Sequence, residues 1–399
     1  MEARQRALAV VSATLLLSVL VWFNYSALLP LIVEDWGLSG VEAGVVFAAF
    51  QAGYVLAILP AGRLADVYST RRVVAVGAVG TGVASIGFAA LADGIYAGTA
   101  LRFLAGVCMA GVYVPGMRFL SDWYPSARRG RAMGVYVGAY SLSTGLSFLL
   151  SSTVAAAVDW RVGIAATSVG ALVAGPLMLV GTRDPPDASP AGVRFDRSLL
   201  RNRTYRYAVG VYAGHAWEVF GVRNWMQAFL VAAPAIAATG NPTVTAGLIT
   251  GTMLSLGGLG NLLGGWASDR FGRASTVAAA LGASALLSLG MGLFDGLSIP
   301  LLVGLVCVYG VVLVADSSPT STVVTEVVDD RNVGVALAFQ SLVGFGATAI
   351  SPVVFGAALD AGGYELAFPT LAAGALVGLA SLAALARAAP DGAAVVAGD

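Results

Sequence analysis

The chain has 399 residues, of which 58% are hydrophobic and only 11% charged, a composition too apolar for a soluble protein of this length. Its 22 basic residues are all arginine and balance 22 carboxylates, so no basic surface is available to bind nucleic acid. Cys108 and Cys307 lie inside apolar runs without metal-ligand spacing. We therefore expect no disulfide, no metal site and no cofactor.

Twelve apolar stretches follow one another along the chain, each long enough to cross a hydrocarbon layer about 30 Å thick as a helix of roughly 20 residues. Strands of a closed barrel would instead show short alternating segments, so the pattern predicts an all-α membrane protein. The expected spans are 7–30, 41–62, 73–92, 95–122, 131–156, 161–181, 205–232, 244–267, 274–294, 299–326, 333–358 and 365–388.

Arginine placement predicts the orientation, because cytoplasmic loops retain positive charge. All loop arginines except Arg161 fall on one side, so both termini are expected to be cytoplasmic in a protein of the cell membrane. The long polar connection 182–204 separates two sets of six helices, in 1–181 and 205–399. Its arginines fit binding to membrane lipid headgroups, although a loop that sets topology explains them as well.

The two halves repeat each other. Gly62 and Asp66 recur as Gly265 and Asp269, an offset of 203 residues, and the pair formed by Pro115 and Asp122 recurs as Pro319 and Glu326, an offset of 204. Two independent landmarks with nearly the same offset predict a parallel internal repeat about an axis normal to the membrane. Such a repeat places a cavity between the halves.

Three motifs carry a family resemblance. Residues 265–273 read GWASDRFGR and keep all five marked positions of a G-x-x-x-D-R-x-G-R loop. The first copy, residues 62–72, has Val67 and Ser69 where that loop has its first Arg and second Gly. Residues 102–106 of the fourth span read RFLAG, an R-x-x-x-G element. With twelve spans and a central loop, the chain resembles the major facilitator superfamily.

The resemblance implies a secondary active transporter, not an enzyme, in which two six-helix halves rock around a central cavity. Residues 115–132 are similar to the organic-anion, nitrate/nitrite and cyanate branches of that superfamily. The fifth and eleventh spans lack a Gly-rich nitrate signature, and the fifth lacks the Gly-Pro element of many drug exporters. These features favour uptake of a small organic or inorganic anion by a monomer.

Charged residues at the helix ends next to the repeated loops predict a gate. Carboxylates that share guanidinium partners would latch one side of the protein closed while the other is open, although solvated ion pairs worth about 0–1 kcal/mol each explain the pattern too. The expected first latch comprises Asp66, Arg71, Arg72 and Asp122, and the second Asp269, Arg270, Arg273 and Glu326.

Charged side chains inside spans are candidate site residues, because each costs at least about 2.5–3.5 kcal/mol at a helix centre. Arg102 in the fourth span and Arg223 in the seventh lie at similar depths, on the order of 9 Å from the middle, and are expected to converge on one anion. Arg118 lies near the cytoplasmic edge, either at the inner mouth or snorkelling and paired with Asp122.

The seventh span has one polar face that includes His215 and Glu218, three residues apart. Either group suits proton coupling, because burial or charge neighbours change its proton affinity between the two states of a transporter. Glu218 could instead neutralise Arg223 or Arg102 as a structural pair. His215 and Glu218 are close enough in the sequence to share a proton or a hydrogen bond.

Weaker candidates for lining the cavity are Asn24, Tyr113, Trp225 and Asp316, which lie on the first, fourth, seventh and tenth spans. For each of the polar ones, an interhelical hydrogen bond worth about 0.6 kcal/mol is a competing explanation. Two other functions remain open at this point. One is a proton-coupled exporter of amphipathic compounds, and the other is an intramembrane enzyme or receptor, for which no nucleophile pair or signalling domain is visible.

Overall fold

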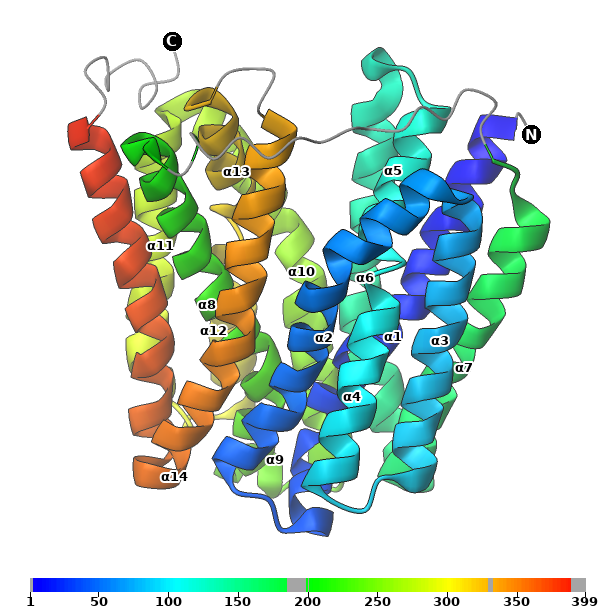
Figure 1. Cartoon of the computed structure of the whole chain (residues 1–399). Coiled ribbons are helices and arrows are strands. Elements are labelled where there is room, and N and C mark those ends of the chain that lie inside the picture. Colours follow the sequence, from blue (N-terminus) through cyan, green and yellow to red (C-terminus); the bar gives the residue numbers. More distant parts are fainter. Residues whose placement is uncertain (1–2, 185–198, 200, 329–332, 389–399) are drawn as a thin grey trace. The chain divides into compact units, whose positions relative to one another are not determined.

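The structure is a computed structural model that describes residues 3–184, 199, 201–328 and 333–388 (Figure 1). Within these residues the secondary structure is helical, without strands. The helices are α1 (Ala3–Trp36), α2 (Gly40–Val67), α3 (Thr70–Leu91), α4 (Ile95–Met109), α5 (Tyr113–Trp123), α6 (Ser126–Ala157), α7 (Trp160–Gly181), α8 (Arg203–Ala232), α9 (Pro234–Ala237), α10 (Pro242–Phe271), α11 (Arg273–Met291), α12 (Ile299–Val312), α13 (Ser317–Glu326) and α14 (Val333–Ala388).

The helices agree with twelve membrane spans. Ten helical segments of the described residues are long and apolar enough to cross a membrane. The segment α14 is interrupted at Gly362 and Gly363, where Gly363 has a φ of 71° that favours glycine, so it supplies two spans and not one. The helix α8 is long enough at 30 residues but is not among the ten, because polar side chains lower its mean hydropathy. The chain is thus an all-α integral membrane protein.

Two spans are broken at equivalent places. The fourth span divides into α4 and α5, and the tenth into α12 and α13; around each break the backbone forms hydrogen bonds to the third residue back, as Val112 N–H does to Met109 and Ala315 N–H to Val312. Val312, the end of α12, lies 203 residues after Met109. Ser317 lies 204 residues after Tyr113. The expected repeat is therefore present in the backbone of these two spans.

The chain forms two compact units. Unit 1 comprises Met1–Ala191 and Thr239–Ser255, and unit 2 comprises Gly192–Ala238 and Leu256–Asp399. The predicted halves differ from these units because the first part of α10 packs on α6. A Cβ on Gly145 of α6 would lie 2.1 Å from the Ser255 side chain, so glycine permits this approach. Most of the connection 182–204 lies outside the described residues.

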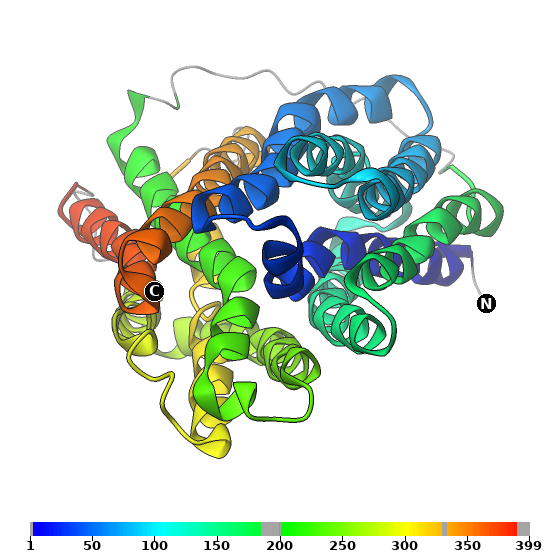
Figure 2. The same ribbon diagram turned by 90° about the horizontal axis from the view of Figure 1, so that it is seen from below.

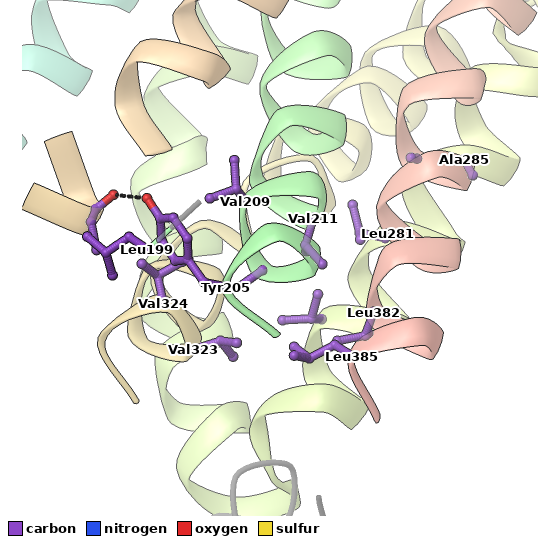
Figure 3. Packing of buried hydrophobic residues seen from close by; sticks show 14 residues of the cluster. Leu199, Tyr205, Val209, Val211, Leu281, Ala285, Val323, Val324, Leu382 and Leu385 are labelled. Atoms are coloured by element: carbon purple, nitrogen blue, oxygen red, sulfur yellow. Dashed lines mark hydrogen bonds between the residues drawn. The ribbon is translucent and has the colours of Figure 1, made fainter. Parts of the chain in front are cut away.

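Each unit is a helical bundle, as the end-on view in Figure 2 shows. In unit 1, α1 packs against α6 and α7, and α3 against α7. In unit 2, α8 packs on α14, which also contacts α11. Figure 3 shows an apolar cluster in unit 2 that joins the first turns of α8 to α11, α13 and α14, with Tyr205 donating a hydrogen bond to the Ala336 carbonyl at 2.8 Å. The polar face of α8 begins one turn beyond Val211 of this cluster.

Candidate functional site

His215 of α8 is held by the break between α12 and α13. Its Nδ1 lies 2.7 Å from Oδ1 of Asp316, the residue before α13. Its Nε2 lies 3.1 Å from the hydroxyl of Ser317. His215 and Asp316 are only 8% and 1% exposed, whereas Ser317 is half-buried. The three side chains form a chain from a buried carboxylate, through an imidazole, to an accessible hydroxyl.

Glu218, one turn along α8 and 1% exposed, belongs to a second network. Its Oε2 accepts a hydrogen bond from Ser284 at 2.8 Å and its Oε1 one from Ser288 at 2.6 Å, both on α11. Tyr309 of α12 contacts the Ser288 hydroxyl and lies 3.5 Å from Oε1. Hydroxyl donors from two helices thus surround a carboxylate inside the bundle of unit 2.

Among the described residues, His215 and Glu218 make separate hydrogen bonds and not one with each other, and their role in proton coupling stays a prediction. The reason is packing: residues three apart lie about 60° apart around the helix and about one turn apart along it, so different neighbouring helices contact them here. His215 contacts α13, and Glu218 contacts α11 and α12.

The other two candidates on α8 have different environments. Arg223 is half-buried, with its guanidinium 5.3 Å from the ring centre of Phe220. Trp225 is 2% exposed; its indole N–H donates to the Pro352 carbonyl at 3.0 Å and its ring stacks on Phe355 at 5.0 Å between centroids. This places Trp225 in the packed interior of unit 2 and leaves Arg223 as the partly accessible cation.

Arg102 is sealed inside unit 1. Its two terminal nitrogens donate to the carbonyls of Val21 and Trp22 at 3.1 and 3.2 Å, and its side chain is 2% exposed. The guanidinium also lies 4.5 Å from the ring centre of Phe50 and 5.3 Å from that of Tyr25. In this conformation the guanidinium joins α4 to α1 and α2. Arg102 and Arg223 belong to different units, and their convergence on one anion stays a prediction.

Asn24 makes interhelical contacts of the kind that competed with a binding role. It is fully buried, and its amide nitrogen lies 3.2 Å from Thr167 Oγ1 and 3.4 Å from Ser85 Oγ. Tyr113 begins α5, with its ring 5.5 Å from that of Tyr140 between centroids. Asn24 therefore ties α1 to α3 and α7, and Tyr113 is part of an aromatic cluster.

The residues of the expected first latch take other partners where they are described. Arg71 donates to the carbonyls of Leu179 and Thr182 at 3.0 and 2.7 Å, and its Nε lies 3.8 Å from Asp184. Arg72 is exposed, with its backbone N–H capped by the Ser69 hydroxyl at the start of α3. The Asp66 side chain lies outside the described residues.

The last carboxylate of that latch, Asp122, lies 3.9 Å from Arg118 on the same helix. This is the snorkelling pair considered as an alternative for Arg118. Asp184 also accepts from Ser69 at 2.6 Å. In unit 1 Arg71 therefore fastens the end of α7 to the start of α3. The shared latch, which also needs the Asp66 side chain, stays a prediction.

The expected second latch is only partly described. Asp269 and Arg270 are exposed at the end of α10, and Arg273 begins α11. The Glu326 side chain lies outside the described residues, so this latch stays a prediction.

The structure adds residues that sequence reasoning missed. Ser284, Ser288 and Tyr309 surround Glu218, and Ser317 contacts His215 through its hydroxyl. One signal was available: Ser284 and Ser288 are four residues apart and share a face of an otherwise apolar helix. In the described part of the chain, no three His, Cys, Asp or Glu residues are placed to hold a metal ion.

Comparisons with known proteins agree with this architecture. The chain is 27% identical over 394 residues to a probable sulfoacetate transporter of Cupriavidus necator, covering 91% of this chain and 88% of the relative. It is 24% identical over 381 residues to the hexuronate transporter of Bacillus subtilis, covering 89% and 88%.

A solved structure and a family model complete the comparison. A bacterial homologue of the human lysosomal transporter Spinster, in an inward-facing and occupied conformation, has a TM-score of 0.78 over 99% of this chain and 96% of its own, at 15% identity. This likeness concerns the fold. The model of the Major Facilitator Superfamily matches residues 11–245 and 219–397. The chain therefore belongs to the major facilitator superfamily and is a transporter, not an enzyme.

Proposed function

We propose that this protein takes up a small organic anion together with protons by alternating access. The observation that carries the anion is the similarity, over most of the chain, to a probable sulfoacetate transporter and a hexuronate transporter. Sulfoacetate and hexuronates each bear a negatively charged carboxylate group. Arg223, half-buried on the polar face of α8, is the residue best suited to bind that group.

Proton coupling rests on the two networks of α8. A carboxylate that is 1% exposed and ringed by hydroxyls is costly to keep ionised inside a membrane protein, so Glu218 is a group that can gain and lose a proton. His215 and Asp316 supply a second site at which a proton can bind and leave. Both sites belong to unit 2, so a proton bound there acts on the same helix as Arg223.

The test is transport by purified protein in liposomes with the interior more alkaline than the exterior. We expect accumulation of sulfoacetate or of a hexuronate such as D-glucuronate, with loss of accumulation when a protonophore removes the gradient. Liposomes without protein are the control. Export of a hydrophobic cation in place of anion uptake would contradict the proposal and support the amphipathic-compound exporter.

We also propose that both termini are cytoplasmic and that the protein lies in the cell membrane, on the strength of its arginine distribution. A reporter fused after residue 388 that is active only in the periplasm or outside the cell should stay inactive. Activity of that reporter would reverse the orientation.

A further inference from the structure

The geometry decides which atoms donate and which accept in the hydrogen bonds that link Asp316, His215 and Ser317. Nδ1 of the imidazole faces the Asp316 carboxylate at 2.7 Å, and Nε2 faces the Ser317 hydroxyl at 3.1 Å. A carboxylate only accepts hydrogen bonds, so the neutral imidazole carries its hydrogen on Nδ1. Nε2 is then an acceptor, and the Ser317 hydroxyl donates to it.

Protonation of His215 reverses one of these two bonds. With hydrogens on both nitrogens, Nε2–H donates to the Ser317 oxygen, and Nδ1–H still donates to Asp316. Ser317 can no longer direct its own hydrogen at the imidazole. That hydrogen is released on the half-buried side chain, the accessible member of the chain. When His215 gains a proton, the Ser317 hydroxyl therefore becomes available to donate a hydrogen bond to another group.

Protonation of His215 also changes the net charge of the Asp316–His215 pair in a way that favours an anion. With a neutral imidazole, Asp316 and His215 carry one negative charge, which repels an anion. After protonation they form an ion pair of zero net charge. An anion near Ser317 thus meets a donor, and no net repulsion from this pair, only when His215 is protonated.

Other charged or titratable groups of unit 2 do not take over this role. On α8 itself, Glu218 interacts electrostatically with His215 and Asp316, but its hydrogen bonds go to α11 and α12. The Tyr212 ring lies 6.1 Å from the imidazole between centroids. Arg223 is two turns away along α8. The remaining groups on the packed helices are Cys307 and Tyr309 of α12, the latter bound to Ser288, and residues at or near helix ends or the α14 interruption: Arg273, Glu326, Asp360, Tyr364, Glu365 and Arg387.

We propose that Ser317 is the residue through which protonation of His215 favours substrate binding, by donating its released hydrogen to a carboxylate or sulfonate oxygen. This proposal rests on the proposed function and assigns a binding role to a hydroxyl within it. It requires no covalent step: a proton from water binds Nε2, and the Ser317 O–H rotates from Nε2 to the anion.

The experiment measures the KM of sulfoacetate uptake at about pH 5.5 and about pH 8. The variant Ser317→Ala keeps His215 and Asp316 but has no hydroxyl. We expect its KM at the lower pH to rise about ten- to a hundredfold, as for a lost hydrogen bond to a charged group, and its KM to lose most of its pH dependence. Ser317→Thr, which keeps the hydroxyl, should restore both.

The matched control is Ser318→Ala, because Ser318 is the exposed neighbour of Ser317 on the same turn. It should behave as the wild type does. A wild-type KM and pH dependence in Ser317→Ala would overturn the proposal while proton-driven uptake stands. If Ser317→Ala is not recovered folded, Ser317→Cys replaces it, since a thiol is a weak donor; wild-type behaviour there has the same meaning. Failure of the proposed function itself would show as absent uptake in the wild type.

Discussion

Glu218→Gln tests whether the buried carboxyl of α8 carries a transported proton, because the amide copies the shape of a protonated carboxyl and cannot titrate. The Ser284 hydroxyl has two acceptors within reach, Glu218 Oε2 at 2.8 Å and the Leu281 carbonyl at 3.2 Å. An amide nitrogen at the Oε2 position would donate to Ser284, which then turns its hydrogen to Leu281. Ser288 still donates to the amide oxygen.

The magnitude follows from this count of hydrogen bonds. One amide hydrogen is left without a partner, so the free energy of unfolding should fall by about 1–3 kcal/mol. Glu218→Leu is the contrasting variant. It removes a charged acceptor from both serines, at about 1.5–3 kcal/mol for each bond, and should be the less stable of the two. Thermal unfolding in detergent checks this order.

Transport by the Gln variant is measured in two modes. Exchange of labelled sulfoacetate at equal pH on both sides needs only substrate binding and the conformational change, so we expect it to persist. Accumulation driven by a pH gradient needs a group that titrates, so we expect it to disappear. Gradient-driven accumulation at the wild-type level would refute the reasoning and place the proton elsewhere.

Four further sets of replacements separate packing from transport. Arg102→Gln should lower the free energy of unfolding by about 1.5–3 kcal/mol for each lost hydrogen bond to α1, and an unchanged unfolding temperature would contradict the sealed position. Arg223→Gln should abolish anion uptake with little effect on unfolding; normal uptake would remove Arg223 from the site. Trp225→Phe should cost about 1 kcal/mol for the lost indole bond and leave KM unchanged, whereas a large rise in KM would restore its binding role. Gly145→Ala should reduce uptake, because its Cβ would meet α10, while Gly138→Ala on the same helix has open space and should not; equal uptake in both would contradict the close approach.

The fold could be predicted from the sequence because each span has a local signal. Twenty apolar residues cannot leave the membrane without exposing backbone or side chains unfavourably, and this constraint needs no knowledge of neighbours. The helix α8 shows the limit of hydropathy alone. Its polar residues lower the average, and its membrane-spanning role follows from its length, its remaining apolar surface and the repeat.

The candidate site was harder to predict, because a side chain's partners depend on packing between helices. Sequence reasoning placed His215 and Glu218 on the polar face of α8 but not their contacts with Ser317 and Ser284. Arg102 shows a second reason. A carbonyl in a helix has a second lone pair, so the backbone of α1 can bind a guanidinium without any sequence signal.

The two broken spans show how one duplicated backbone carries different chemistry in each unit. The break in unit 1 contains Val112, and the equivalent position in unit 2, 204 residues later, is Asp316. Tyr113 likewise corresponds to Ser317. Because valine and tyrosine at these positions offer neither a carboxylate nor a serine hydroxyl, the break in unit 1 cannot form the chain seen at His215. In unit 1 the buried Arg102 is instead fixed to backbone carbonyls, which hold its charge without exchanging a proton. Substitutions that uncouple protons from the anion should therefore map to α8, α11, α12 and α13, whereas those in α4 and α5 should change stability or rate and leave the coupling intact.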